Sequence, residues 1–306
     1  HCGYYLIMSR VFLLLTLWVI GSVVSNAQRY INLSVDNDLY FGTDWYYSSG
    51  IFISTGKLKI VENQEEGFPK TYLHWTLGQE IYTPSTRYTR DESYFDYPYG
   101  GWLYLDYNIE KYKSPFSAWG VSLKAGATGK ASLAPFFQNL YHDKILGLPD
   151  VAWEKPLPQK FHVNLNGNLR KRISLANRLA FLYEFFGNLG TQRIAAGGRL
   201  GVLMGTSEAL SFMGNPLEME IKGHGVYCRT RQEYLYHDYM VSGSLFNNAA
   251  PFVLTSIPYK NSWEVGFAFY RDKWRFLVLW NNVSKDNELQ VNARHPYLNI
   301  SITRFY

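Results

Sequence analysis

Three short runs of this chain carry side chains that could move protons to and from an oxygen atom. Asn37 and Asp38 place an amide beside a carboxylate, Ser48 supplies a hydroxyl, and Gln138 and His142 place an amide near an imidazole. An imidazole acts as a general base when an oxygen nucleophile lies nearby and a partner fixes its tautomer. We therefore expect general-base chemistry at His142, with Gln138 or Asp38 as the partner of the ring.

Asn37 and Asp38 end a segment that alternates as a membrane strand should. Ile31, Leu33 and Val35 share one face of this strand, and Asn37 continues their parity. An amide at the end of a lipid-facing row indicates a site where polar chemistry meets a lipid. The alternative is an Asx turn, because Asn and Asp hydrogen-bond to nearby backbone and favour turns.

Ser48 lies in the run 43–50, which leads into a second strand that begins near Ile51. If the two strands pair as in a hairpin, Ser48 lies across from Asn37 and Asp38. Two adjacent strands would then build one polar cluster. In the alternative interpretation, the run is only the turn and the opening of the second strand, and Ser48 is solvated.

His142 lies in a region, about 130–160, that shows no strand pattern and contains four prolines. A helix over 136–147 would place Gln138 and His142 on one face, because residues four apart are neighbours on a helix. Loops this long in a compact fold are usually functional or disordered. The alternative for His142 is a surface residue, or a core residue with its hydrogen bonds satisfied.

The rest of the chain consists of short alternating segments separated by polar or Gly/Pro-rich stretches. After residue 28, no apolar run reaches the length of a transmembrane helix. Aromatic residues near several segment ends are typical of the girdle of an outer-membrane barrel. We expect an all-β fold, a transmembrane antiparallel β-barrel of about 12 strands, with a short helix in a long extracellular loop. A soluble β-sandwich would also alternate. The clearest alternating segments are 71–82, 161–169, 179–185, 263–269, 274–280 and 298–306.

Composition agrees with export and a membrane barrel. Tyr (25) outnumbers Phe (19) in the 306 residues, and the mean hydropathy of −0.20 suits strands with a polar lumen face. Residues 1–27 are predicted to be a signal peptide, with Arg10 before an apolar stretch, and translation is expected to start at Met8. We expect a single outer-membrane barrel domain over 28–306. The net charge of +5 includes no basic block, so we expect no nucleic-acid partner.

Taken in order, these runs resemble the outer-membrane lipid A 3′-O-deacylases, β-barrel hydrolases that act on lipopolysaccharide. The resemblance covers most of the chain after the signal peptide, and it is the ordered set of landmarks that is specific. Trp45 stands where the family has Arg, and Ser48 takes the position of a family hydroxyl. The matching landmarks are Ser34-Val35-Asp36-Asn37-Asp38, the run 43–50, Ile81-Tyr82-Thr83-Pro84, the run 97–105, Gly129, Gln138-Asn139, His142, Gly187-Asn188 and the closing aromatic strand.

The resemblance implies a fold, an activity and a site. It implies removal of an acyl or acyloxyacyl chain from lipid A, with His142 as base and with Asn37, Asp38 and Ser48 completing the site. Gln138 and Asp44 would support it. Calcium is the implied cofactor and would polarise the ester carbonyl, with Asp38 as one of its ligands. The nucleophile is either a water or Ser48 itself.

The expected partners are lipopolysaccharide in the outer leaflet and the outer-membrane bilayer. The protein is expected to be a monomer. Four basic residues are candidates for the lipid A phosphates, because cationic side chains make strong hydrogen bonds to phosphate: Arg87, Arg90, Lys130 and Lys144.

The sequence also departs from the family pattern. Lys130 stands where Pro is usual, Leu133-Ala134 replace a glycine-rich turn, and Leu148 takes the place of a Glu found in some members. Two other functions therefore stay open at the level of sequence. One is a non-catalytic barrel, either a pore or a structural protein, and the other is a phospholipase that acts on other lipids.

Overall fold

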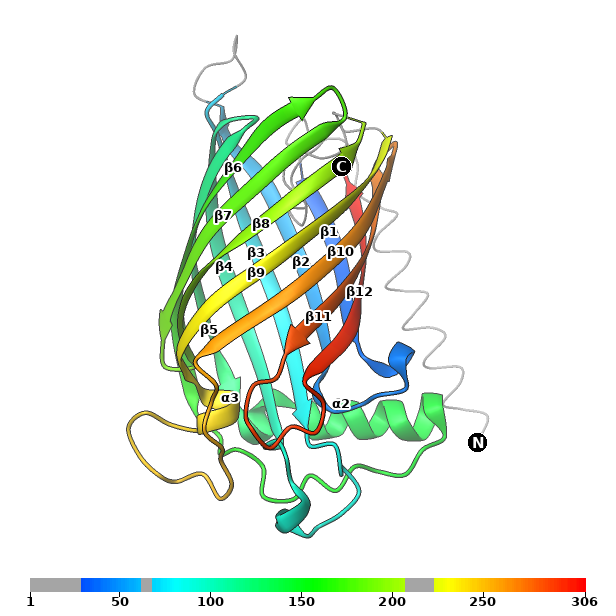
Figure 1. The fold of residues 1–306 in the computed structure, drawn as a ribbon, viewed down its shortest axis with the longest axis vertical. Helices are drawn as coiled ribbons and strands as arrows, with labels where there is room; N and C mark the ends of the chain where they lie inside the picture. The colour runs from blue at the N-terminus through cyan, green and yellow to red at the C-terminus, as the bar shows by residue number, and fades with distance from the viewer. Residues whose placement is uncertain (1–28, 62–67, 207–222) are drawn as a thin grey trace.

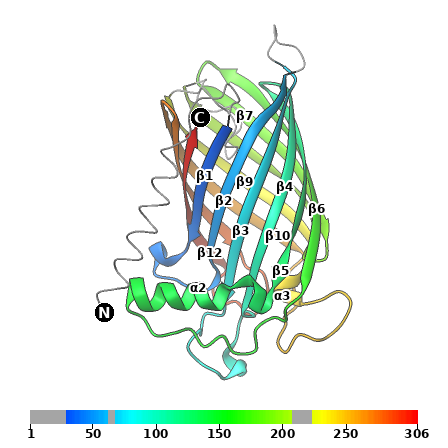
Figure 2. The same ribbon diagram turned by 180° about the vertical axis from the view of Figure 1, so that it is seen from behind.

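Twelve antiparallel strands close into a barrel in the computed structural model, which describes residues 29–61, 68–206 and 223–306 (Figures 1 and 2). Each strand pairs with its neighbours in sequence, and β1 closes on β12, with Tyr30 opposite Phe305. The strands are β1 (Arg29–Asn37), β2 (Tyr46–Val61), β3 (Lys70–Thr83), β4 (Gly100–Ser114), β5 (Ser117–Thr128), β6 (Phe161–Ala176), β7 (Leu179–Gly190), β8 (Arg193–Gly205), β9 (Gly223–Asp238), β10 (Tyr259–Arg271), β11 (Trp274–Ser284) and β12 (Arg294–Phe305). The predicted membrane barrel is confirmed, and the β-sandwich alternative is wrong.

The helical elements lie in the connections at one end of the barrel. They are η1 (Leu39–Phe41), η2 (Glu92–Tyr94), η3 (Gly129–Ser132), α2 (Ala134–Tyr141), the π-helical turn η4 (His142–Leu146) and α3 (Tyr239–Ser242). The predicted helix over 136–147 corresponds to α2 and η4. Within the described residues, no helix is long and apolar enough to cross a bilayer.

Strand alternation divides the side chains between the lipid and the lumen. Leu33, Trp75 and Leu165 are about half exposed on the outer wall, whereas their neighbours Asn32, His74 and Asn164 are buried inside. A closed sheet leaves no strand edge, so every spanning strand can satisfy its backbone hydrogen bonds in the bilayer. The period-2 pattern of the sequence therefore becomes an apolar outer surface around a polar interior.

The two ends of the barrel differ in the length of their connections. Short turns such as 115–116, 177–178 and 272–273 lie at the end that also holds the C-terminus, and the long loops 84–99, 129–160 and 239–258 lie at the other end (Figure 1). Short turns face the periplasm and long loops face outward in such barrels. The predicted signal peptide, 1–27, falls outside the described residues and stays a prediction, as does the single domain over 28–306.

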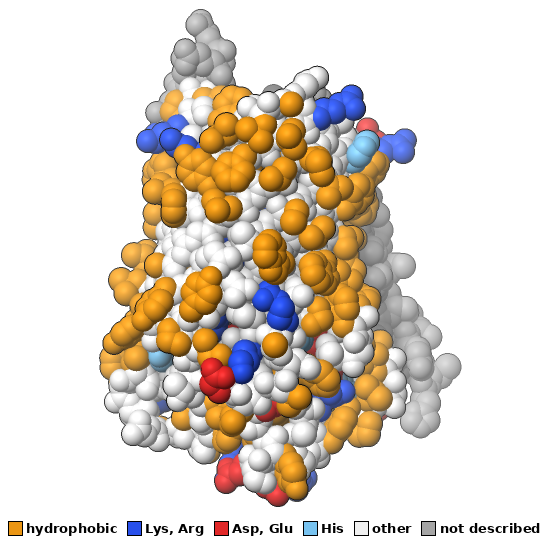
Figure 3. All heavy atoms as spheres, viewed as in Figure 1, with side chains coloured by type: hydrophobic (Ala, Val, Ile, Leu, Met, Phe, Trp, Pro, Cys, Tyr) orange, Lys and Arg blue, Asp and Glu red, His pale blue; other side chains and the backbone are white. Residues whose placement is uncertain are grey.

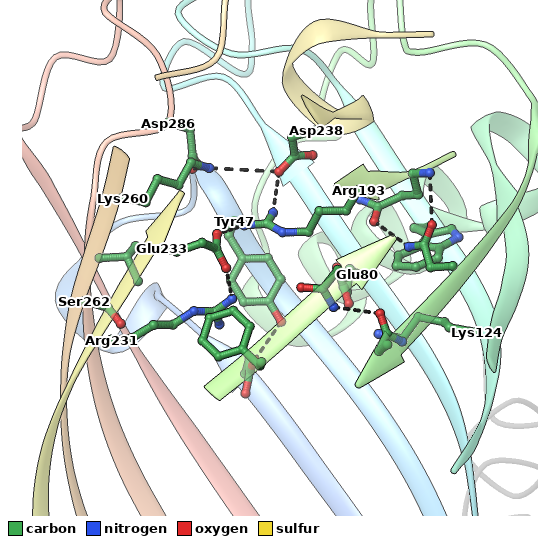
Figure 4. A pocket seen from close by; sticks show the side chains of 18 of the residues that line it. Tyr47, Glu80, Lys124, Arg193, Arg231, Glu233, Asp238, Lys260, Ser262 and Asp286 are labelled. Carbon is green, nitrogen blue, oxygen red and sulfur yellow. Dashed lines mark hydrogen bonds and ion pairs between the residues drawn. The ribbon is translucent and has the colours of Figure 1, made fainter. Parts of the chain in front are cut away.

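Charged side chains fill the extracellular half of the lumen, around a cavity of about 520 Å³ (Figure 4). Arg193 lies at the centre of this cluster. Its guanidinium contacts Glu233 and lies 2.5 Å from Asp238 Oδ2, while Arg231 also contacts Glu233 and Lys260 contacts Asp286. Buried charges of this kind are stable only as a connected set.

Packed side chains occupy both ends of the lumen. At the extracellular end the packed residues are Tyr46, Tyr97, Trp102, Tyr104, Leu157, Tyr239, Met240 and Val241, and at the periplasmic end they are Tyr30, Tyr72, Tyr112, Ala118, Tyr227, Tyr270 and Leu277.

The luminal cluster predicts a large stability effect. Arg193→Ala leaves Glu233 and Asp238 in the lumen without their shared cation, and breaking such a buried pair costs about 3–5 kcal/mol. Urea unfolding of the refolded protein in detergent micelles measures this loss. Arg178→Ala, at an exposed turn, is the control and should change stability by less than about 0.5 kcal/mol. Equal stability of the two variants would contradict the role of the cluster.

Candidate active site

The candidate site is an apolar groove on the outside of the barrel, at its extracellular end. One wall consists of the ends of β1, β2 and β3, and the other consists of α2 and η4 (Figure 2). Its volume is about 460 Å³. The lining is mostly apolar, with a few polar groups: Val35, Asn37, Leu39, Tyr40, Asp44, Ser49, Ile51, Ile81, Phe137, Gln138, Leu140, Tyr141, His142, Lys144, Ile145 and Leu146.

The end of β1 brings Asn37 to the groove. Asn37 pairs with Ser49 across the sheet, and its Oδ1 accepts a hydrogen bond from the backbone N–H of Leu39 at 2.7 Å. That bond is the Asx turn expected as the alternative for this pair, and it coexists with an outward position on the lipid-facing row. The backbone N–H of Asp38 donates to the carbonyl of Ser48 at 3.3 Å, so the predicted pairing of the two runs is confirmed.

Asp38 and Ser48 lie behind the groove wall and do not line it. Asp38 is 1% exposed, and its Oδ2 accepts from the backbone N–H of Trp45 at 3.1 Å. Burial raises the pKa of the Asp38 carboxyl to about 8. Ser48 Oγ donates to the carbonyl of Ile81 at 3.4 Å, next to a bulge between Tyr47 and Ser49.

The loop that carries His142 begins with a turn in the left-handed backbone conformation, which favours glycine. Gly129 has φ +66°, and a Cβ at this position would lie 2.5 Å from the backbone nitrogen of Gln159. The side chain of Gln79 then donates to the carbonyl of Ser132 at 2.6 Å. Gln79 is the polar residue that interrupts the outward apolar row of β3, and this contact explains why. Pro135 lies in the first turn of α2, which begins at Ala134, and there its missing N–H costs nothing.

His142 is buried and holds hydrogen bonds at both ring nitrogens. Its Nε2 lies 2.8 Å from Asp44 Oδ2, and its Nδ1 lies 3.2 Å from the carbonyl oxygen of Pro149. The sequence-based expectation that Asp38 or Gln138 fixes the ring is therefore wrong. Gln138 contacts Asp44 instead, with its Nε2 3.5 Å from Asp44 Oδ1.

These contacts define the protonation state of His142 in this arrangement. A carbonyl and an ionised carboxylate accept hydrogen bonds and do not donate them, so both nitrogens carry a proton and the ring is an imidazolium. Burial lowers the pKa of His142. The hydrogen bond and the charge of Asp44 raise it by more, so the pKa lies above its usual value of 6.5. Asp44 is thus the group that sets the proton affinity of the ring.

Arg87 supplies a second cation to Asp44. Its Nε lies 3.0 Å from Asp44 Oδ2, the same oxygen that His142 contacts. The backbone carbonyl of Arg87 accepts from Tyr99 Oη at 2.7 Å and from the N–H of Ala152 at 3.0 Å. This residue therefore joins the loops 84–99 and 129–160. The sequence offered Arg87 only as a phosphate ligand and gave no signal for either contact, nor for the carbonyl of Pro149.

The other three phosphate candidates are placed differently. Lys144 lines the groove and lies 2.6 Å from the exposed Asp143. Arg90 and Lys130 are exposed on the loops 84–99 and 129–160 and do not line the groove.

One buried oxygen, Asp38 Oδ1, is available to a cation, while Asp38 Oδ2 lies 3.7 Å from His295 Nε2. Among the described residues, no three His, Cys, Asp or Glu side chains gather as a metal cluster, but calcium also takes amide and carbonyl oxygens. Asp38 Oδ1 is buried and has no hydrogen-bond partner within the described part of the chain. A buried carboxylate with a raised pKa and an unused oxygen fits a cation, whereas Asp44 is already neutralised by Arg87 and His142.

The loop turn makes a prediction that needs no activity. Gly129→Ala adds a Cβ against the backbone of residue 159, so the loop 129–160 should open and trypsin should cleave it faster. Gly147→Ala is the matched control, because Gly147 has nearly the same φ, +64°, but nothing lies within 4 Å of an added Cβ. Both variants carry the left-handed cost of roughly 1–2 kcal/mol. Equal cleavage of the loop in the two variants would show that the contact with residue 159 is unimportant.

Comparisons with known proteins identify the family to which the chain is similar. Residues 9–305 match the family model described as outer membrane protein LpxR. The solved structure of LpxR from Salmonella typhimurium is similar with a TM-score of 0.75 and 16% identity, covering 90% of this chain and 100% of that one.

More distant likenesses include two autotransporter barrels. The beta domain of the Bordetella autotransporter Brka has 11% identity and a TM-score of 0.45, covering 91% of this chain and 98% of that one. The translocator domain of NalP from Neisseria meningitidis has 7% identity and a TM-score of 0.45, covering 99% and 96%. No curated protein matches the chain. At these identities the solved structures show the fold alone.

Proposed function

Because this chain belongs to the LpxR outer membrane protein family, we propose that its outer groove holds an acyl chain of lipid A while His142 and Asp44 hydrolyse the ester. The family is one of lipid A 3′-O-deacylases, so the chain is an ester hydrolase of the outer membrane. The observation that carries the site assignment is a buried imidazole–carboxylate pair, 2.8 Å apart, at an apolar groove on the outside of the barrel.

The groove suits a substrate that is already in the bilayer. Val35, Ile51 and Ile81 continue the lipid-facing wall of the barrel into the groove, and Phe137 and Leu140 cover it from the helix. An acyl chain can therefore enter sideways from the outer leaflet without crossing water, and burial of its methylene groups supplies binding free energy of about 0.8 kcal/mol each. All the proposed residues come from one chain, which is consistent with a monomer.

The reaction needs one proton acceptor that later becomes a donor. In its neutral form His142 keeps the Nδ1 proton on the carbonyl of Pro149, and Nε2 accepts a proton from water once its contact with Asp44 opens. The water oxygen attacks the acyl carbonyl carbon and forms a tetrahedral intermediate. As the ester bond to the sugar oxygen breaks, Nε2 returns the proton to that oxygen, leaving a sugar hydroxyl and a free fatty acid.

Arg87 keeps Asp44 ready for the next proton. When His142 is neutral, its Nε2 no longer donates to Asp44, and the carboxylate would be buried with one fewer partner. The guanidinium of Arg87 and the amide of Gln138 hold it in place. Asp44 then stabilises the imidazolium that forms as the water attacks.

Asn37 is the proposed donor to the oxyanion. Its Oδ1 is fixed on Leu39, which directs its Nδ2 amide away from that turn, and it lines the groove. A preorganised oxyanion donor contributes about 3–4 kcal/mol in other hydrolases. Ser48 is a positioning group in this scheme, since its hydroxyl is buried on the carbonyl of Ile81. That contact favours water over Ser48 as the nucleophile.

Calcium fits beside these groups at Asp38, whose buried Oδ1 would hold it. Because Asp38 lies behind the groove wall, an ion there would act on the site through the turn that carries Asn37. Binding would also keep the Asp38 carboxyl ionised at neutral pH, against the burial that raises its pKa to about 8.

For the phosphates of lipid A, Lys144 is the basic residue that lines the groove, with Arg90 and Lys130 on the exposed loops outside it. Arg87 would reach a phosphate only by leaving Asp44. Leu148 stands where some members have a Glu, and the carboxylate that contacts the ring here is that of Asp44.

Removal of the imidazole tests the proposal. His142→Ala should lower deacylation by about 10²–10⁴-fold, the usual contribution of a general acid–base group. The readout is the mass spectrum of lipid A from a Gram-negative host that expresses the protein in its outer membrane. The wild type should remove the 3′ acyloxyacyl mass, and the variant should leave it in place.

His224→Ala is the matched control, because His224 is exposed on β9 at the far end of the barrel. It should deacylate as the wild type does. Persistence of deacylation in His142→Ala would refute the assignment of the base, and unchanged lipid A together with phospholipid breakdown would indicate a phospholipase instead.

The pH dependence of kcat/KM tests Asp44. The base works only when neutral. In the wild type, kcat/KM should therefore be low at pH values below the pKa of His142, which lies above 6.5, and should rise as the pH passes through it. Asp44→Asn removes the carboxylate that raises the pKa, leaving burial to lower it, and the acidic limb should move to lower pH. Asp143→Asn, which changes an exposed carboxylate nearby, should leave the limb in place. If the acidic limb of Asp44→Asn stays at the wild-type pH, Asp44 does not set the pKa of His142.

A further inference from the structure

Basic side chains gather at the periplasmic rim of the barrel, at the end opposite the groove. Among the described residues outside the lumen at this rim, Asp272 is the acidic counterpart. The glutamates within 62–67 and 207–222 lie outside the described residues. Figure 3 shows basic side chains beyond the apolar wall at the end where the C-terminus lies. The basic residues are Arg29, Lys57, Lys59, Lys111, Lys113, Lys171, Arg178, Arg271, Lys273 and Arg304.

Two of these cations are forced together by the sheet. Arg29 of β1 lies directly opposite Lys57 of β2, and both side chains are exposed on the outer wall. Lys59 follows on the same face of β2, and Arg304 lies opposite Ile31 on the other neighbour of β1. Like charges directly opposite each other in a sheet repel, so this arrangement calls for an anion.

The surroundings of the pair identify the kind of anion. The same outward rows continue with Ile31, Leu33 and Ile53, and the last two are about half exposed. The guanidinium of Arg304 lies 5.6 Å from the ring centre of Trp274. Long basic side chains at the edge of an apolar wall extend their charge to the membrane interface. A ligand here must offer an anionic phosphate above acyl chains that lie along the wall.

We propose that Arg29 and Lys57, with Lys59 and Arg304 beside them, form a binding site for the phosphate of an anionic glycerophospholipid in the periplasmic leaflet. The side chains project sideways from the wall, into the position of a headgroup and not of a soluble periplasmic partner. Because the site lies at the other end of the barrel from His142, its ligand is distinct from the lipid A of the outer leaflet. It would fix the depth and tilt of β12, β1 and β2, and β1 ends at Asn37.

Native mass spectrometry of the refolded full chain in detergent tests this site. The probes are phosphatidylglycerol, which is anionic, and phosphatidylcholine, which is zwitterionic, each titrated against the protein. The test variant is R29Q/K57Q. The control is K113Q/K171Q, which removes two cations from the same rim on β4 and β6, strands that do not pair with each other. The heat-dependent shift on gels verifies that each variant is folded.

The wild type should bind its first phosphatidylglycerol at least about tenfold more tightly than phosphatidylcholine, as expected for several basic side chains near a surface. R29Q/K57Q should lose roughly tenfold in this affinity, and K113Q/K171Q should lose less than about threefold. Equal losses in the two double variants would overturn the site and leave only a diffuse positive rim. Displacement of the lipid by an equal concentration of glycerol 3-phosphate would overturn the lipid as its ligand.

Discussion

The chemistry of this protein depends on one carboxylate oxygen. Asp44 Oδ2 lies 2.8 Å from His142 Nε2 and 3.0 Å from Arg87 Nε. This position couples the proton affinity of the imidazole to a fixed guanidinium, in a place that bulk water reaches poorly. Without Asp44, burial would lower the pKa of the ring, and the carbonyl of Pro149 alone would hold it. Without Arg87, the carboxylate would have no cation whenever His142 is neutral.

The barrel explains why this pair lies on the outer wall. A closed sheet in a bilayer uses all its backbone hydrogen bonds within itself, and here the lumen is filled by ion pairs and packed aromatic rings. Loop residues are therefore brought against the wall from outside. The contact of Gln79 with Ser132 and the turn at Gly129 hold α2 over the ends of β1 and β2. The groove between them faces the acyl chains of the outer leaflet, which is the location that an enzyme of lipid A requires.

Local patterns predicted the local structure, and the long-range contacts escaped them. Period-2 alternation predicted the barrel, and the spacing of Gln138 and His142 predicted the helix, because both patterns are properties of a single element. Asp44 and His142 are 98 positions apart, and no periodicity reports that distance. The sequence therefore indicates Gln138 or Asp38 as the partner of the ring, because both belong to the runs that resemble the family, whereas the structure places Asp44 there. Arg87 was read as a phosphate ligand for the same reason, since its charge is visible in the sequence and its neighbour is not.

The most direct measurement of the central claim is the titration of the His142 ring by nitrogen-resolved NMR, with the signal assigned from its absence in His142→Gln. The ring should carry protons on both nitrogens below its pKa and lose the Nε2 proton at a pKa above 6.5, while Nδ1 stays protonated. A ring that titrates below 6.5, or that keeps its proton on Nε2 when neutral, would contradict it.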